Sequence, residues 1–246
     1  MHVIAVLWDR ISGTQPQPPA WVIGLTGLVA LVVVLNTQVW RLAGKVITIA
    51  HEGGHALVSV LSGRRLDGIR LHSDSSGVTY SRGRGTGPGL VLTAAAGYVM
   101  PSLLGAGAAC LLAAGHLTAM LWLALFLLAA TFLAIRNLYG GAAVLVTAGA
   151  VFAISYYAGA AVQAGFAYLA AWFLLLGGVR PAFELARGRR QRWARGSDAD
   201  QLARLTGAPA GLWVTLFMLV AFGALVLGVA LLVPPSWHLA WLTAHS

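Results

Sequence analysis

The chain of 246 residues has little charge and very few acidic side chains. Charged residues make up 9% of it, only seven residues are Asp or Glu, and Cys110 is the single cysteine. One cysteine excludes an intramolecular disulfide and argues against a metal site built from thiolates. The net charge of +9 is compatible with a nucleic-acid partner, but the arginines are grouped at the ends of long apolar runs. We therefore expect no nucleic-acid partner.

Long apolar runs dominate the composition, which is 59% hydrophobic. Windows near the ~20 residues needed to cross a bilayer predict an all-α polytopic membrane protein with about seven transmembrane helices. An N-terminal leader, residues 1–20, contains the polar, proline-containing stretch DRISGTQPQPP before the first window. It has no small-residue cleavage pattern, so we expect a retained span rather than a signal peptide. A single membrane domain at 21–233 and a tail at 234–246 follow. The windows are 21–40, 44–62, 90–113, 117–135, 138–157, 161–180 and 211–233.

Two polar segments, 63–89 and 180–206, carry most of the arginines. The positive-inside rule places both in the cytoplasm, and the even number of windows between them agrees. Counting outward predicts a cytoplasmic N-terminus and an outer C-terminus, with Trp237 and Trp241 in an outer aromatic belt. We expect an integral protein of a bacterial plasma membrane, whose basic cluster RGRRQRW touches anionic lipid.

Segment 63–89 is the one long polar insertion with extended character. Its sequence GIRLHSDSSGVTYSRG alternates apolar and polar residues and is broken by Ser-Ser-Gly. This pattern predicts a small cytoplasmic β-hairpin after the preceding span.

A cluster of ionisable residues lies within TIAHEGGHALVSVL, residues 48–61. On a helix, His51 and His55 share a face and Glu52 lies one position round. Two imidazoles at this spacing predict Zn²⁺ ligands, with Glu52 taking a proton from a water in the open position. The alternative is a metal-free polar patch bonded to neighbouring helices. Unpaired polar groups in hydrocarbon are costly, which favours the metal.

Two glycines, Gly53 and Gly54, interrupt this helix, where each costs roughly 1 kcal/mol relative to alanine. They either leave room for a substrate strand beside the metal or let a neighbouring helix pack closely.

The HEGGH motif in a span, followed by a short hairpin and further spans, resembles the site-2 proteases, a family of intramembrane zinc metalloproteases. The resemblance implies hydrolysis of a peptide bond in a single-span membrane protein, after an earlier trimming step. It also implies a later asparagine and an aspartate in an LDG-type sequence as third zinc ligand. This chain departs from that pattern, because it contains no LDG and no Asn-x-x-Pro.

The segment GSDADQLARLTG, residues 196–207, offers the closest substitute for the missing aspartate. Asp198 stands four residues before Leu202, similar to the family's Asp-Gly-Gly-x-Leu, and Asp200 is the second candidate. Ser197 and Asp200 also match a capping box, which leaves Asp198 in the first turn, where the helix dipole favours a carboxylate. Capping alone, with no ligand role, is the alternative.

Asn137, in IRNLYGG, is the candidate for the family's asparagine. In that role it hydrogen-bonds the substrate backbone or the developing oxyanion; the alternative is a helix-turn residue beside Gly140 and Gly141. The remaining polar candidates are expected to be interfacial or structural. They are His72, His116 and His238, together with Tyr98 and Pro101 in a kinked helix contact.

Two other functions stay open at this point. The missing LDG supports a catalytically silent relative that acts as a membrane scaffold or regulator. A metal-cation transporter would also use intramembrane histidines, but a transit path favours several carboxylates, and the predicted spans contain only Glu52.

Overall fold

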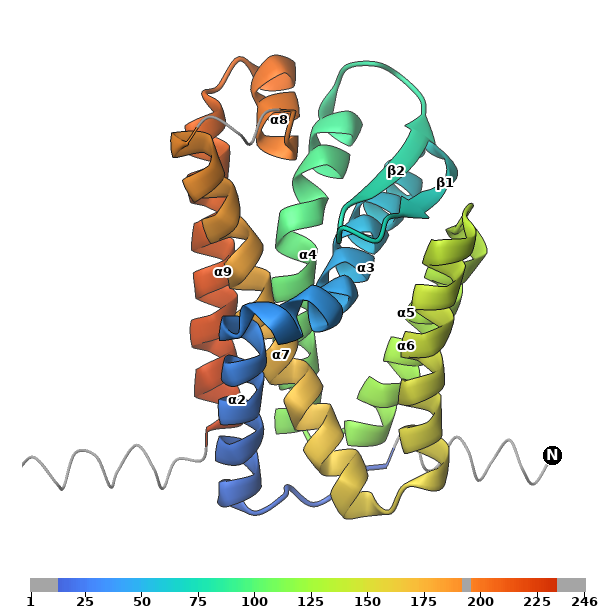
Figure 1. Ribbon diagram of the computed structural model, residues 1–246, viewed down its shortest axis with the longest axis vertical. Coiled ribbons are helices and arrows are strands. Elements are labelled where there is room, and N and C mark those ends of the chain that lie inside the picture. The colour runs from blue at the N-terminus through green and yellow to red at the C-terminus, as the bar shows by residue number, and fades with distance from the viewer. Residues whose placement is uncertain (1–12, 192–195, 234–246) are drawn as a thin grey trace, which may run out of the picture.

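The computed structural model describes residues 13–191 and 196–233, which form a helical bundle with one small sheet at one end (Figure 1). Residues 1–12, 192–195 and 234–246 lie outside this description, so Trp237, Trp241 and His238 are not placed. The described elements, in chain order, are α2 (Ala20–Leu35), α3 (Thr37–Leu61), β1 (Arg65–Leu71), β2 (Gly77–Arg82), α4 (Pro88–Ala113), α5 (Leu117–Ala134), α6 (Leu138–Tyr157), α7 (Ala160–Arg190), α8 (Asp198–Thr206) and α9 (Ala210–Leu232).

Helices α2 and α3 form a bent pair. They meet at 103°, and the side chain of Asn36 between them caps α3 by accepting the backbone N–H groups of Gln38 and Val39 at 2.9 and 3.1 Å. α2 has 16 residues, about 24 Å at 1.5 Å per residue, which is shorter than the hydrocarbon core of about 30 Å. In Figure 1, α2 rises to the middle of the molecule and α3 continues obliquely to the upper end.

The span count differs from the sequence prediction for this reason. The described residues contain five helices long and apolar enough to cross a membrane, or six spans if the bent pair counts as one. The windows 21–40 and 44–62 are not two separate spans, because the polar residues after Leu35 restart the helix and change its direction. The other five windows coincide with α4, α5, α6, α7 and α9, although α7 continues past the predicted end to Arg190.

Strands β1 and β2 form the predicted hairpin within 63–89. They pair antiparallel, from Arg65 opposite Arg82 to Leu71 opposite Gly77. Asp74 closes the turn by accepting the backbone N–H and the hydroxyl of Ser76 at 3.0 and 2.6 Å. The hairpin folds back over α3, which brings β2 beside the HEGGH segment.

Helix α4 is the centre of the bundle and packs against α3, α7, α8 and α9. Small residues permit this, since a Cβ at Gly105 would lie 2.8 Å from the backbone nitrogen of Leu175 in α7. Half of the most apolar stretch of α4 is buried, against 22% for α5 and 17% for α6. The α5–α6 pair therefore stands at the edge of the bundle, as Figure 1 shows.

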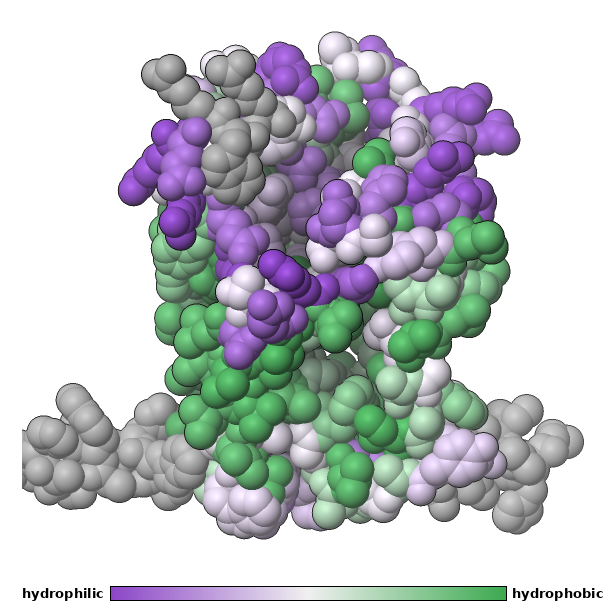
Figure 2. Space-filling model, in the orientation of Figure 1, coloured by the Kyte–Doolittle hydropathy of each residue, from purple (hydrophilic) through white to green (hydrophobic). Residues whose placement is uncertain are grey.

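The described chain begins and ends at the same end of the bundle, opposite the hairpin and α8 (Figure 1). Ile23 of α2 and Leu232 of α9 belong to one buried cluster with Leu112 and Leu117, which flank the turn between α4 and α5. With the bent pair counted as one span, this arrangement corresponds to six crossings, whereas the sequence predicted about seven. Figure 2 shows a hydrophobic belt around the middle and lower part, and hydrophilic surface at the end with the hairpin and α8.

Candidate metal centre

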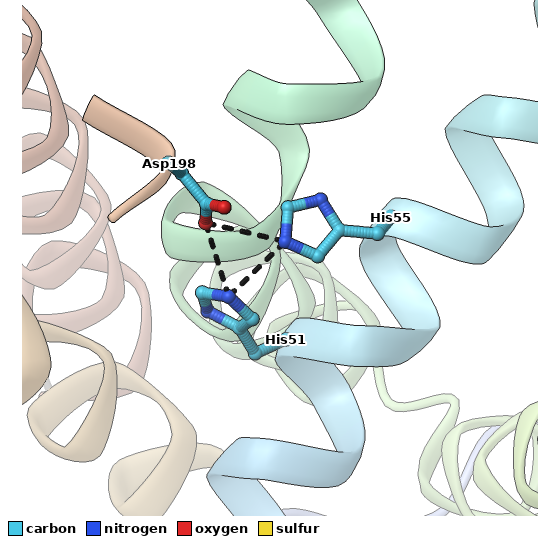
Figure 3. A group of neighbouring side chains, drawn as sticks. All are labelled: His51, His55 and Asp198. Atoms are coloured by element: carbon cyan, nitrogen blue, oxygen red, sulfur yellow. Dashed lines mark hydrogen bonds and ion pairs between the residues drawn. The ribbon is translucent and has the colours of Figure 1, made fainter. Parts of the chain in front are cut away.

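The HEGGH segment lies in the middle of α3, whose polar residues form one stripe along the helix. His51 and His55 are one helical turn apart, so both imidazoles point from α3 toward α8 (Figure 3). His55 is buried and His51 is half-buried. The helix thus presents two adjacent nitrogen donors inside the bundle.

Asp198 of α8 completes a triangle with these histidines (Figure 3). Its Oδ2 atom lies 3.2 Å from Nε2 of His51 and 3.2 Å from Nε2 of His55. The two Nε2 atoms are 3.1 Å apart. The structure therefore brings together, within 4.8 Å of one another, the three residues proposed from the sequence as metal ligands.

The hydrogen-bonding pattern around the triangle fits a cation. Nδ1 of His55 lies 2.7 Å from the backbone oxygen of Thr93, which can only accept, so Nδ1 carries a hydrogen and the neutral ring presents a lone pair on Nε2. Oδ2 of Asp198 is buried and accepts no hydrogen bond from the described residues. Lone pairs that face one another repel unless a cation lies between them. Ligands about 2.0–2.1 Å from a tetrahedral zinc ion stand about 3.3 Å apart, close to the distances observed.

Asp198 is ionised in this environment. Burial disfavours the charge, but His51 and His55, acting as proton donors, outweigh burial and hold the pKa of the Asp198 carboxyl well below its usual range. The side chain is therefore an anionic oxygen donor. A metal ion that replaces the protons on Nε2 would find it beside two neutral nitrogen donors, a set that suits zinc.

Helix α8 is held in place by contacts that leave Asp198 free. The predicted capping box is present, because the side chain of Ser197 caps the helix and Oδ2 of Asp200 accepts the backbone N–H of Ser197 at 3.2 Å. Asp200 also pairs with Arg189 at the end of α7. Asp200, the second ligand candidate, is thus engaged in capping and in an ion pair, and Asp198 faces the histidines.

Helix α4 closes the centre from the other side through a residue that sequence reasoning missed. A Cβ at Gly97 would lie 2.3 Å from Nε2 of His55 and 2.5 Å from Nε2 of His51. No side chain fits there, so the backbone of α4 forms the wall. Thr93, one turn earlier, was also missed, because a carbonyl contact across 38 residues leaves no mark in the sequence.

The two glycines of the motif, Gly53 and Gly54, have different surroundings. A Cβ at Gly54 would lie 2.5 Å from Cβ of Met100 in α4, which supports the helix-packing interpretation for Gly54. At Gly53 the nearest atom, Oγ1 of Thr131, would be 3.5 Å away, an ordinary contact.

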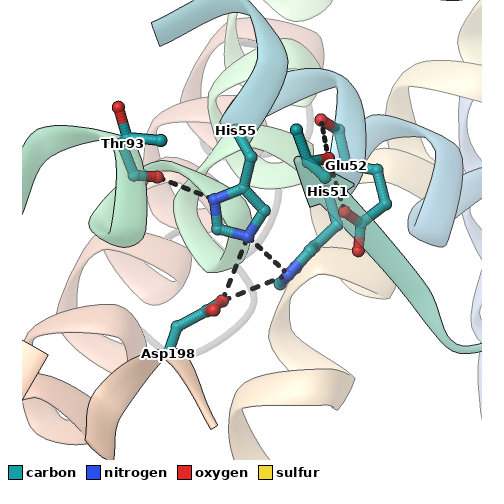
Figure 4. Close-up of polar contacts among 6 residues, drawn as sticks. His51, Glu52, His55, Thr93 and Asp198 are labelled. Atoms are coloured by element: carbon teal, nitrogen blue, oxygen red, sulfur yellow. Dashed lines mark hydrogen bonds and ion pairs between the residues drawn. The ribbon is translucent and has the colours of Figure 1, made fainter. Parts of the chain in front are cut away.

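Glu52 lies on the side of the histidines away from Asp198 (Figure 4). Its side chain is buried, with 4% of the residue exposed. Its Oε2 accepts the hydroxyl of Thr79 in β2 at 2.7 Å. Glu52 thus contributes no atom to the triangle and stands between the metal centre and the hairpin.

A cavity of about 460 Å³ opens beside His51 and Glu52. It runs along the polar stripe of α3, past Thr48 to Arg41, and is closed by the hairpin turn and α7. The N-terminal part of α3, from Trp40 to Thr48, therefore lines this cavity. Tyr98 also lines it, with its ring edge-on to His51 at 4.8 Å between centroids.

Asn137 is tied to the hairpin. Its Nδ2 donates to the backbone oxygen of Leu71 at 2.7 Å, and its Oδ1 accepts the Leu71 N–H at 3.2 Å. Both ends of the amide are engaged with β1, and the structure does not place Asn137 among the metal ligands. Its role toward substrate stays a prediction. His72 is exposed beside Ser76, and His116 precedes α5 at the opposite end of the bundle.

The apolar helices fit an integral membrane protein, and its centre holds a candidate His-His-Asp metal site with an adjacent buried glutamate. The model of the Peptidase M50B-like family matches residues 24–228. The chain belongs to this family, which is the site-2 protease family, as the resemblance had indicated. No curated protein and no solved structure matches the chain significantly.

Proposed function

We propose that this protein is an intramembrane zinc metalloprotease that hydrolyses peptide bonds of single-span membrane proteins. The convergence of His51, His55 and Asp198 is the observation that carries the proposal. These three residues would hold Zn²⁺, which supplies a water of lowered pKa and polarises the carbonyl to be attacked.

The chain's own groups account for the proton transfers. Glu52 accepts a proton from the water whose oxygen bonds to the peptide carbonyl carbon. It then gives that proton to the nitrogen as the C–N bond breaks. The Thr93 carbonyl holds His55 in the tautomer that presents Nε2 to the metal. The cavity along α3 offers a path for an unwound substrate segment to reach Glu52.

The sidedness of the protein belongs to the same proposal. The hairpin and α7–α8 carry most of the arginines, so this end faces the cytoplasm. The ends of the described chain then face the opposite side, which replaces the cytoplasmic N-terminus that seven spans required.

Glu52→Gln tests the proposal directly. The variant keeps the shape of the side chain, and Glu52 is not a ligand, so we expect it to bind zinc as tightly as the parent protein. Cleavage of a single-span substrate in proteoliposomes should fall by at least about 10²-fold, the lower range for general acid–base catalysis. Zinc is measured by elemental analysis and cleavage by mass spectrometry.

The other two functions give different results in the same experiment. Zinc bound by the parent protein without cleavage would indicate a silent relative. Zinc flux into the vesicles that survives Glu52→Gln would indicate a transporter. Loss of zinc in Glu52→Gln equal to that in His51→Ala would contradict the role given to Glu52.

A further inference from the structure

Strand β2 lies directly against the side chain of Glu52. The hydroxyl of Thr79 is 2.7 Å from Oε2 of Glu52 and 3.1 Å from its backbone oxygen. The hydroxyl has a single proton, and the shorter contact is to the carboxylate, the stronger acceptor. A buried carboxylate requires such a donor, because burial without one costs several kcal/mol. Thr79 therefore fixes one oxygen of Glu52.

The second oxygen of Glu52 lies over Gly77. A Cβ at this position would be 2.5 Å from Cγ of Glu52 and 2.7 Å from Oε1. The backbone of Gly77 is not in the left-handed region, so the requirement is for space rather than for an unusual conformation. Gly77 and Glu52 both line the cavity, and Oε1 is the carboxylate oxygen that lies against Gly77.

We propose that strand β2 orients the general base of the site. Thr79 holds Oε2, Gly77 leaves room for Oε1, and Oε1 is the atom that exchanges protons. This inference rests on the proposed protease function. It makes Thr79 and Gly77 positioning residues, and it makes the hairpin part of the active site. A carboxylate held by one oxygen is ready for proton transfer without first losing rotational freedom.

Activity and zinc content in matched variants provide the first test. Thr79→Val removes the hydroxyl at nearly constant shape, and Thr79→Ser restores it. We expect Thr79→Val to lower kcat by about 10- to 100-fold, part of the contribution of a general base, with zinc content and KM unchanged within about twofold. Thr79→Ser should recover most of kcat. Equal losses in the Val and Ser variants, or none in the Val variant, would overturn the proposal.

Gly77→Ala tests the second contact. The added methyl group must displace the carboxylate, so kcat should fall as far as in Thr79→Val while zinc stays bound. Gly85→Ala is the control, because a Cβ at Gly85 has no atom within 4 Å. Wild-type kcat in Gly77→Ala, or an equal fall in Gly85→Ala, would contradict the role of Gly77.

Binding of acetohydroxamate to the zinc-loaded protein supplies a readout that needs no turnover. This chelator offers the metal two oxygens and gives the nearby glutamate a proton to accept. We expect Thr79→Val to weaken binding about tenfold when Glu52 is present, the size of one charged hydrogen bond. In Glu52→Gln the same change should have less than about a twofold effect.

An equal effect in both backgrounds would show that Thr79 merely fastens the hairpin, and would overturn the inference. Failure of the proposed protease function would give a different set of results from failure of this inference. In that case the parent protein cleaves no substrate, while the acetohydroxamate cycle still reports whether Thr79 acts through Glu52.

Discussion

At Gly97 the backbone of α4 comes so close to the two imidazoles that even a methyl group would clash with both of their Nε2 atoms. We expect Gly97→Ala to lower zinc affinity by more than about tenfold, because the histidines must turn away from the ion. Removing a group that only hydrogen-bonds to a metal ligand already lowers metal affinity by about 10- to 100-fold. Competition with a zinc-selective chelator measures the change. Gly107→Ala on the same helix is the control, since a Cβ there meets nothing within 4 Å.

The two carboxylates of α8 should behave differently. Asp198→Ala removes a ligand, so its zinc affinity should fall by more than about 100-fold, beyond the effect of losing a supporting group. Asp200→Ala removes a helix cap and the partner of Arg189, which costs about 1 kcal/mol of stability and leaves the ligands in place. Zinc titration of both variants separates them. Equal affinities would show that Asp198 does not reach the metal.

Sequence reasoning reached Asp198 because acidic residues are so scarce that the alternatives could be enumerated. It could not reach Thr93, Gly97, Gly77 or Thr79, since each acts through a contact with α3 that only the folded chain creates. Glycines and threonines are common in spans and hairpins, and their types carry no signal of such contacts. The donor set was predictable from the residues, whereas the groups that orient it were not.

At the scale of elements, the α5–α6 pair packs against α3, α4 and α7 and is also joined to strand β1 of the hairpin by hydrogen bonds. Asn137 pairs with the Leu71 backbone, and Arg136 donates its N–H to the oxygen of Ile69 at 2.9 Å. Hydrogen bonds between one amide side chain and a strand backbone can be removed by a single substitution. A single substitution at Asn137 therefore tests directly whether these hydrogen bonds hold β1 against the turn between α5 and α6.

Asn137→Ala should loosen the edge of β1 without affecting zinc. Two hydrogen bonds are lost, each worth about 1 kcal/mol net, so amide exchange around Leu71 should accelerate by roughly tenfold or more. Hydrogen–deuterium exchange read by mass spectrometry checks this. If exchange is unchanged while cleavage falls with a raised KM, Asn137 acts on the substrate, as the resemblance implied.

The helices α4, α5, α6, α7 and α9 were predictable because each is a long apolar run with clear ends. The bend between α2 and α3 was missed, because averaging over a window of about 20 residues hides a single capping residue. The signal was present in Asn36-Thr37-Gln38, where a side chain that favours N-caps is followed by polar residues. Two local hydrogen bonds at Asn36 thus accompany a bend that hydropathy alone does not reveal.

At the scale of the whole molecule, the even number of crossings predicts sidedness. In a Cys110→Ser background, cysteines at Ser76 in the hairpin turn and at Arg204 in α8 should react with an impermeant maleimide from the cytoplasmic side only. A cysteine at Thr14, before α2, should react from the opposite side only. Labelling of intact cells and of inverted vesicles gives the comparison. Reaction of Thr14→Cys and Ser76→Cys from the same side would instead support the odd number of membrane crossings predicted from the sequence.

The wide separation of the ligands along the chain has a consequence for biosynthesis. The two histidines are made early, but Asp198 follows about 140 residues later, roughly 7 to 30 s at 5–20 residues per second. During that time the growing chain passes through the membrane with only two of the three candidate metal ligands. Two imidazoles hold zinc far less firmly than three ligands do. Under the proposed function, hydrolytic competence would arise only after α8 has been synthesised and has docked, so neighbouring unfinished membrane chains would not be exposed to cleavage before then.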